Sequence, residues 1–205
     1  MSDKEPMRPQ LWTERPVEET IAVYRDWAKT YDADVAGRGY RTPGRMAAML
    51  KLHLPEGHGP ILDFGCGTGI SGAALAAAGI GPLHGTDITD EMVEVARTKG
   101  LYEKLWVGDP GAQPAQPGDY DVIFAAGVVS LGAAPPETLD NLIDALAPGG
   151  LLILSFNDPT LENGSYDAQL QKHLDQGAVS LIAREHGPHL DDMDMGSDVI
   201  LLRRE

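Results

Sequence analysis

Residues 61–69 read ILDFGCGTG, and this stretch decides the fold. A short apolar run of strand character carries Asp63 near its end and then breaks into alternating glycines at Gly65, Gly67 and Gly69. Glycines spaced in this way let the backbone turn sharply and approach a ligand, while the helix that follows offers free N–H groups at its N-terminus. The stretch therefore predicts a strand, a glycine turn and a helix of the kind that binds nucleotides.

The segments that follow alternate between strand and helix patterns. Helices are predicted over 69–79, 89–100 and 137–150, and strands over 82–88, 105–109, 121–127 and 151–157. The strands are apolar on both faces, which is typical of a parallel sheet covered by helices. An amphipathic helix is expected over 17–35 and a second one near 45–52, both ahead of the first strand.

The C-terminal part departs from this alternation. A helix is predicted over 167–177 and strands over 178–186 and 198–205, and the polar segment 186–197 is too short for a crossover helix. These strands are therefore expected to be antiparallel neighbours. We expect an α/β fold that is Rossmann-like and doubly wound, with a mostly parallel seven-stranded sheet, an antiparallel terminal strand and N-terminal helices. The expected organisation is a single domain over 1–205, with a flexible lead-in (1–16), N-terminal helices (17–54) and a core (60–205).

Composition and charge narrow the function classes. The chain has 205 residues and a formal charge of −15, from 16 Lys and Arg against 31 Asp and Glu. Nucleic-acid binding depends on cations that neutralise phosphates, and the largest cationic cluster is the pair Arg203 and Arg204, so a nucleic-acid partner is disfavoured. The lone Cys66 excludes an intramolecular disulfide and a multi-cysteine metal site, and it favours a reducing, cytoplasmic location. Neither a membrane span nor a secretory signal is expected.

The glycine pattern alone fits two cofactor chemistries. Gly67, Gly69 and Gly72 satisfy G-x-G-x-x-G, and Asp87 follows about twenty residues later, as a dinucleotide fingerprint requires. A carboxylate at Asp63 repels a pyrophosphate but attracts the cationic methionine end of S-adenosylmethionine. The antiparallel terminal strands and the lack of a Tyr-x-x-x-Lys pair also speak against a dehydrogenase. S-adenosylmethionine is therefore the expected cofactor, and an NAD-dependent oxidoreductase remains a distant alternative.

Several motifs carry a family resemblance. ILDFGCGTG, HGTDITDEMVEVAR, WVGD, YDVIFAAGV and LAPGGLLILSF resemble, in order and spacing, the core motifs of class I S-adenosylmethionine-dependent methyltransferases. YRDWAKTYDADVAGRGYRTP, LHGTDIT, GLYEKL and GVVSLGAAPPETL are similar to the methyltransferase-like proteins named for the Williams–Beuren syndrome chromosome region. The first resemblance covers roughly residues 20–157 and implies methyl transfer from S-adenosylmethionine. The second resemblance does not imply a particular substrate.

The resemblance also implies positions for the cofactor. Asp63 is expected to act on the methionine ammonium through water or backbone, and Tyr31 to cap the methionine end. Asp87 is expected to hold the ribose hydroxyls, while Ile88 packs on the adenine face and Asp109 contacts the adenine amino group. Pro110 departs from the family pattern because it has no N–H to donate to adenine N1. The remaining expected contacts, made by the glycine turn and by the end of the fourth strand, are Gly65, Cys66, Gly67, Ala126 and Gly127.

The acceptor is expected to be a small molecule that binds beyond the carboxyl ends of the first and fourth strands. No catalytic residue is assigned, because methyl transfer mainly needs alignment and a general base is optional. A non-catalytic S-adenosylmethionine-binding regulatory module is the alternative from another class. The histidines and acids of the segment 186–194 could be drawn as a metal site, but an acidic loop is the commoner explanation and no metal is expected. The candidate acceptor-site residues are Tyr24, Tyr40, Arg41, Asn157 and Tyr166.

Overall fold

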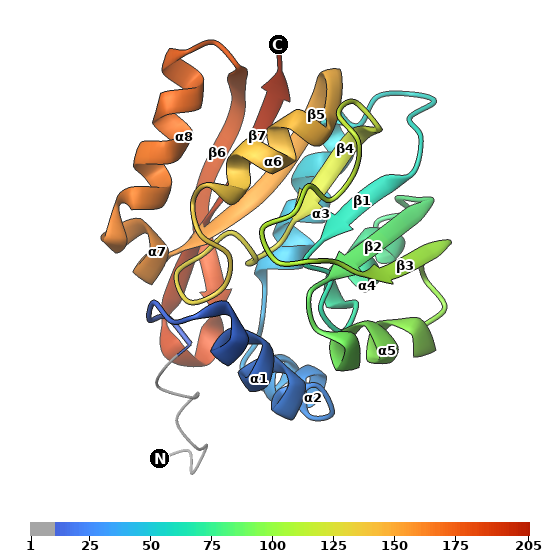
Figure 1. Cartoon of the computed structure of the whole chain (residues 1–205), viewed down its shortest axis with the longest axis vertical. Coiled ribbons are helices and arrows are strands. Elements are labelled where there is room, and N and C mark those ends of the chain that lie inside the picture. The colour runs from blue at the N-terminus through green and yellow to red at the C-terminus, as the bar shows by residue number, and fades with distance from the viewer. Residues whose placement is uncertain (1–10) are drawn as a thin grey trace.

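A seven-stranded sheet with the order β3-β2-β1-β4-β5-β7-β6 organises the protein (Figure 1). The structure is a computed structural model and describes residues 11–205. Strands β1 to β5 run parallel to one another, and β7 runs antiparallel to both β5 and β6. The strands are β1 (Ile61–Phe64), β2 (Leu83–Asp87), β3 (Lys104–Val107), β4 (Tyr120–Ala125), β5 (Leu146–Asn157), β6 (Val179–Leu190) and β7 (Met195–Arg204).

Helices cover both faces of the sheet. Helices α3 and α4 pack on one face and α6 and α8 on the other, while α1 and α2 lie across the carboxyl ends of the parallel strands (Figure 1). The helices are α1 (Val17–Trp27), α2 (Tyr31–Ala36), α3 (Thr42–His53), α4 (Ile70–Ala77), α5 (Asp90–Thr98), α6 (Thr138–Ala145), α7 (Asp158–Asn163) and α8 (Ser165–Asp175). A 3-10 turn, η1 (Asp191–Met193), links β6 to β7.

The central strands are buried on both faces. In β4, Ile123 packs into the cluster beneath α6 and α8, and its neighbour Phe124 packs into the cluster beneath α3 and α4. Both side chains are fully buried, as are Leu152 and Ile153, which alternate in the same way along β5. Because successive side chains of a strand point to opposite faces, apolar residues at every position are what a doubly covered sheet requires. The expected Rossmann-like fold, with its antiparallel terminal strand, is confirmed.

Several local expectations differ from the structure. The helix predicted over 137–150 ends at Ala145, and β5 already begins at Leu146. The predicted helix over 17–35 is interrupted at residues 28–30, where the Asp34 carboxylate accepts a hydrogen bond of 2.6 Å from Trp27 Nε1 and one of 3.0 Å from Thr30 Oγ1. The segment expected to be a polar loop, 186–197, is largely strand, because β6 continues to Leu190 and pairs with β7. Helix α7 was not expected, and Asn157 Oδ1 caps it by accepting from Thr160 N at 3.1 Å.

The described part of the expected flexible lead-in packs against the fold. Leu11 is buried together with Trp27 and Val35, and Arg15 donates from Nη2 to the carbonyl of Gly132 at 2.6 Å. Residues 11–16 therefore belong to the folded structure, which corrects that part of the expectation. Residues 1–10, the rest of the expected lead-in, lie outside the described residues.

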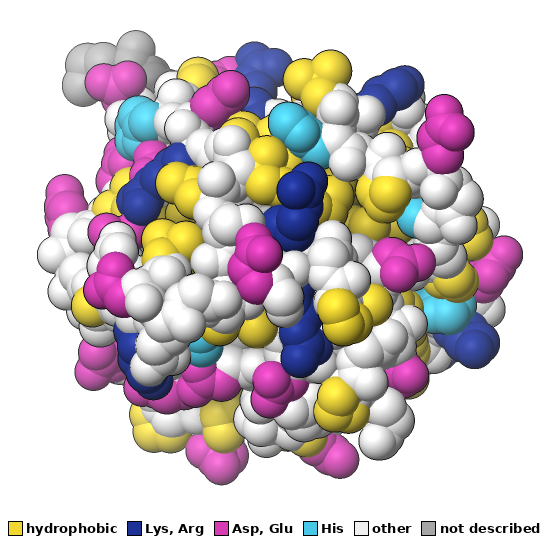
Figure 2. Space-filling view, turned by 90° about the horizontal axis from the view of Figure 1, so that it is seen from above, with side chains coloured by type: hydrophobic (Ala, Val, Ile, Leu, Met, Phe, Trp, Pro, Cys, Tyr) yellow, Lys and Arg dark blue, Asp and Glu magenta, His cyan; other side chains and the backbone are white. Residues whose placement is uncertain are grey.

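Charge is spread over the surface. On the face shown in Figure 2, the Lys and Arg side chains lie apart from one another among acidic and neutral groups. Within residues 11–205, no helix has the length and apolar character needed to cross a membrane.

Candidate functional site

The glycine turn after β1 is fixed to the neighbouring strand. The backbone N–H groups of Gly65 and Cys66 both donate to the carbonyl of Thr86, at 2.9 and 3.0 Å. The turn then reverses through Gly67 (φ +51°) and Gly69 (φ +87°), and Gly69 caps the N-terminus of α4. Positive φ values of this size favour glycine because other residues are strained there.

Two glycines of this turn have different roles. A β-carbon on Gly65 would collide with the side chain of Val128, which follows β4, so this glycine permits close packing between two loops. A β-carbon on Gly67 would meet no protein atom within 4 Å. Since Gly67 also lines the main cavity of the protein, the space beside it is open to a ligand.

Asp87, at the end of β2, is linked to the same turn. Its Oδ2 accepts from Gly67 N at 3.0 Å, and its Oδ1 accepts from Thr89 N at 2.8 Å. Burial raises the pKa of this carboxyl, and the two backbone N–H groups oppose that rise. These contacts hold the side chain in place in the wall of the cavity, where hydroxyl groups of a ligand can reach it.

The structure places Asp63 behind the turn rather than in the cavity wall. The side chain is fully buried, and its Oδ2 accepts from Ser71 Oγ and from Tyr102 Oη, each at 2.6 Å. Among the described residues, Oδ1 has no hydrogen-bond partner. Burial raises the pKa of the Asp63 carboxyl to about 6. Sequence reasoning did not identify Tyr102, which has no motif of its own and whose ring fills the space beside Gly72 and Gly85.

The buried Asp63 predicts a pH-dependent change in stability. Because its carboxyl has a pKa of about 6 in the folded chain and 3.8 as the reference, the folded state binds the proton more tightly. The free energy of unfolding is therefore expected to fall as the pH rises from 4 to 7, by about 2 kcal/mol from this group, because the proton is lost as the pH passes the folded-state pKa. In Asp63→Asn the amide oxygen can still accept from Ser71 and Tyr102, so this part of the decline should disappear. Urea unfolding of both proteins between pH 4 and 8 measures the difference, and parallel curves would exclude Asp63 as its source.

A cavity of about 620 Å³ opens at the carboxyl ends of the parallel strands. Cys66 is not among its lining residues, since its side chain is buried and burial raises the pKa of its thiol. Both backbone polar groups of Gly127 are already engaged, because its N–H donates to Ser155 Oγ at 3.0 Å and its carbonyl accepts from Ser130 Oγ at 2.8 Å. The expected cofactor residues that line the cavity are Tyr31, Gly65, Gly67, Asp87, Ile88, Asp109, Ala126 and Gly127.

The N-terminal helices close one side of this cavity. Asp32, at the start of α2, accepts from Thr68 Oγ1 of the glycine turn at 2.5 Å and pairs with Lys99 Nζ at 2.6 Å. These contacts fix the adjacent Tyr31 against the cavity, where its ring centroid lies 4.6 Å from that of Trp27 in an edge-on arrangement. Tyr24 and Tyr31 therefore pack against Trp27 and also form part of the cavity wall.

A smaller cavity of about 60 Å³ adjoins the first, since Tyr24, Tyr31 and Gly127 line both. Two of the predicted acceptor-site residues, Tyr40 and Asn157, line it as well, together with His189. Two other acceptor-site candidates, Tyr166 and Arg41, do not line this smaller cavity. Tyr166 lines the large cavity and donates to the carbonyl of Ala134 at 3.3 Å, and Arg41 lines neither cavity and is exposed, with its Nε 2.7 Å from Asp191 Oδ2.

Sequence reasoning missed much of the wall of the large cavity. Met92 and Trp106 add apolar surface near Ile88, and the loop over 108–114 borders the same space. Thr86 also lines the cavity, and its buried Oγ1 has no partner among the described residues. The Asp87 carboxylate, the unpartnered Thr86 hydroxyl and the apolar walls together fit a ligand that combines hydroxyl groups with a flat apolar part.

The described residues hold no group of three or more His, Cys, Asp or Glu side chains arranged to bind a metal ion. The acids of the segment 186–194 have other partners, since Asp191 pairs with Arg41 and Asp192 with Arg38.

Comparisons with known proteins agree with this geometry. Residues 61–150 match the family model described as "Methyltransferase domain". The chain is 36% identical over 163 residues to Methyltransferase-like protein 27 of Homo sapiens. The aligned region covers 76% of this chain and 64% of that protein. The chain is also 36% identical over 141 residues to a Ribosomal protein L11 methyltransferase of Syntrophotalea carbinolica, covering 64% of this chain and 44% of that protein. The chain therefore spans less than two thirds of the length of these relatives.

A solved structure shows the same fold. Magnesium protoporphyrin IX methyltransferase from Synechocystis PCC 6803, with bound SAH, superposes with a TM-score of 0.66 at 19% identity, over 91% of this chain and all (100%) of that one.

Proposed function

Since this chain belongs to the class I S-adenosylmethionine-dependent methyltransferases, we propose that it transfers the methyl group of S-adenosylmethionine to an acceptor in the cavity system at the carboxyl ends of the strands. The observation that carries the proposal is the pairing of Asp87 with Gly67 at the edge of the large cavity. S-adenosylmethionine, when bound, supplies a methyl group activated by its sulfonium.

The cavity wall suggests how the cofactor would be held. Asp87 accepts from the ribose hydroxyls, and the open side of Gly67 leaves room for the nucleoside. The unpartnered Thr86 Oγ1 offers a further acceptor in the cavity wall, and Asp63 Oδ1, behind the turn, can accept from an ordered water. Tyr31, fixed by the neighbouring Asp32, closes the methionine end.

The adenine end is assigned to Ile88 and Asp109, which both line the cavity. Pro110, which follows Asp109 in the same wall, has no N–H. The hydrogen bond to adenine N1 that the family usually draws from this position must therefore come from another donor.

The chain's own contribution to catalysis is alignment. Burial raises the pKa values of the Tyr24, Tyr31 and Tyr40 hydroxyls, so these groups stay protonated near neutral pH and do not act as bases. Holding the acceptor in line with the carbon–sulfur bond can supply roughly 7–11 kcal/mol in favourable cases. We assign no residue as a general base.

A small molecule is the proposed acceptor, and the proposed location is cytoplasmic. The N-terminal helices narrow the acceptor end of the cavity, and the adjoining space measures only about 60 Å³. The charge of −15 and the scattered cations weigh against nucleic acid as the substrate. The single cysteine supports a reducing compartment.

Calorimetry with S-adenosylhomocysteine and with NADH tests the proposed cofactor. We expect saturable binding of S-adenosylhomocysteine and none of NADH, and preferential binding of NADH would favour an oxidoreductase. Release of S-adenosylhomocysteine from S-adenosylmethionine, in the presence of mixed metabolites, separates an enzyme from a binding module. Tight cofactor binding without turnover over a broad acceptor panel would indicate the module.

A further inference from the structure

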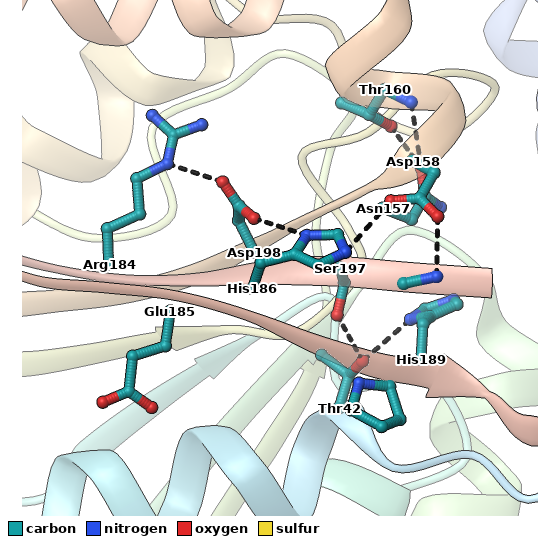
Figure 3. Close-up of polar contacts among 12 residues, drawn as sticks. Thr42, Asn157, Asp158, Thr160, Arg184, Glu185, His186, His189, Ser197 and Asp198 are labelled. Carbon is teal, nitrogen blue, oxygen red and sulfur yellow. Dashed lines mark hydrogen bonds and ion pairs between the residues drawn. The ribbon is translucent and has the colours of Figure 1, made fainter.

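The hydrogen bonds behind the small cavity fix the protonation of His189. Its Nδ1 lies 2.8 Å from Thr42 Oγ1, and this hydroxyl lies 2.8 Å from Ser197 Oγ (Figure 3). Ser197 Oγ in turn accepts from Arg45 Nη1 at 3.1 Å. Thr42 and Ser197 are fully buried, so their hydroxyl protons need partners inside the protein.

The arginine sets the direction of this chain of hydrogen bonds. A guanidinium can only donate, so Ser197 Oγ accepts from it and gives its own proton to Thr42, and Thr42 then donates to His189 Nδ1. In the opposite direction, the Ser197 proton would have no acceptor among the hydrogen bonds of the described residues. Nδ1 is therefore an acceptor, and the proton of the neutral ring is on Nε2. Burial lowers the pKa of His189 to about 4, which agrees with a neutral ring.

Asn157 is oriented by its capping role. Its Oδ1 accepts from Thr160 N at 3.1 Å and from Thr160 Oγ1 at 2.7 Å, next to the start of α7 (Figure 3). Because the amide oxygen already accepts these two hydrogen bonds, the NH2 group is the part of the side chain that can donate to a ligand in the cavity that Asn157 lines. Its polar neighbours in that wall, the hydroxyl of Tyr40 and the Nε2–H of His189, are donors as well. Among the described residues, no carboxylate, ammonium or guanidinium lines this cavity.

We propose that the small cavity is the acceptor subsite and that it takes a small anionic nucleophile, a thiolate, through neutral N–H and O–H donors. This rests on the proposed methyl transfer. The space of about 60 Å³ has room for roughly four to six non-hydrogen atoms. An amine would bring N–H groups that the Asn157 NH2 and the His189 Nε2–H cannot accept, whereas an anion offers only lone pairs. An acceptor that arrives deprotonated also explains why no base is found there.

The transfer balances without a proton. A lone pair of the anion forms the bond to the methyl carbon while the carbon–sulfur bond breaks, and the electrons of that bond go to sulfur. One positive and one negative charge disappear, and the products are the methylated acceptor and S-adenosylhomocysteine. Because the charges cancel, a cavity of low polarity favours the step.

Binding to the protein loaded with S-adenosylhomocysteine tests the subsite. The probes are thioacetate, thioacetamide and acetamidinium, which have the same number of non-hydrogen atoms and differ in charge. We expect thioacetate to bind at least about tenfold more tightly than acetamidinium or thioacetamide. Equal or reversed affinities would overturn the proposal. If S-adenosylhomocysteine itself does not bind, the proposed function fails; if it binds and thioacetate is not preferred, only this inference fails.

Asn157→Asp separates the donor role from the capping role. An aspartate keeps the oxygen that caps α7 but replaces the NH2 group with a second negatively charged oxygen. We expect thioacetate binding to weaken at least about tenfold, with unchanged affinity for S-adenosylhomocysteine. Asn163→Asp is the matched control, since Asn163, at the exposed C-terminal end of α7, accepts at Oδ1 from Ser165 N at 3.3 Å. A purely structural role for Asn157 predicts no effect on thioacetate, and that result would contradict the proposal.

The ring nitrogens of His189 give an independent measurement. Nitrogen-15 spectra at pH 7, assigned with His189→Gln, distinguish protonation at Nε2 from protonation at Nδ1. We expect the Nε2–H form. A proton on Nδ1, or a charged ring, would mean that His189 is not a neutral Nε2–H donor to the acceptor, and this result would overturn the proposal.

Discussion

Gly67→Val is expected to abolish measurable binding of S-adenosylhomocysteine while leaving the chain folded. The added side chain meets no protein atom around its β-carbon and extends into the space that we assign to the nucleoside. Displacing the ligand should weaken binding by about 100-fold or more, or roughly 2.7 kcal/mol. The valine also adopts φ near +51°, which costs about 1–2 kcal/mol of stability. Calorimetry measures the binding, and thermal unfolding measures the stability.

Gly57→Val is the matched control for backbone strain. Gly57 has φ of +72°, lies in an exposed turn between α3 and β1, and has no atom within 4 Å of an added β-carbon. We expect a similar loss of stability there with no change in ligand affinity. Retained affinity in Gly67→Val would mean that the nucleoside does not pass over the glycine turn.

The fold was predictable from local patterns because each signal lies within a few residues of sequence. The run before Gly65 predicts a buried strand, and the next segments repeat strand and helix at lengths that suit a parallel sheet. Asp87 was predictable for the same reason, since it follows the glycines at the spacing of the nucleotide-binding fold. The resemblance to the methyltransferase family rests on these same segments.

Contacts between distant residues could not be predicted in this way. Asp63 seemed from its place at the strand end to face the ligand, but Ser71 and Tyr102 enclose one of its oxygens from the far side of the turn. His189 was one of several histidines without a recognisable spacing, and its role depends on Thr42, which lies 147 residues away. No periodicity encodes such pairs, because tertiary packing decides them.

Arg41 differs in the other direction. It was selected as an acceptor-site candidate because it lies among the N-terminal helices, but its guanidinium is exposed and bonds to Asp191 in η1. The neighbouring Tyr40 does line the small cavity, where its ring centroid lies 5.2 Å from that of His189. Adjacent residues on an irregular segment can face opposite ways, so sequence position alone could not separate them.

Asp87→Ala is expected to weaken binding of S-adenosylhomocysteine by about 1.5–3 kcal/mol, the range for hydrogen bonds to a charged group. This corresponds to roughly a 10- to 150-fold rise in the dissociation constant. The substitution removes the acceptor for the ribose hydroxyls, and it also frees Gly67 N, which Asp87 holds at 3.0 Å. Both effects act on the ligand, one directly and one through the shape of the turn.

The same substitution should change the stability of the fold much less than it changes binding. Burial raises the pKa of Asp87, which means that the folded chain disfavours its charge, so removing the carboxylate relieves part of that penalty while two backbone bonds are lost. Asp119→Ala is the control, because the exposed Asp119 also accepts from a backbone N–H, that of Gln116 at 3.0 Å, and neither residue lines the cavity. If both variants bind S-adenosylhomocysteine as tightly as the unmodified chain, Asp87 does not hold the ribose and the cofactor assignment must move away from β2. If only Asp87→Ala weakens binding at nearly constant unfolding temperature, the carboxylate at the end of β2 acts on the ligand and not on the fold.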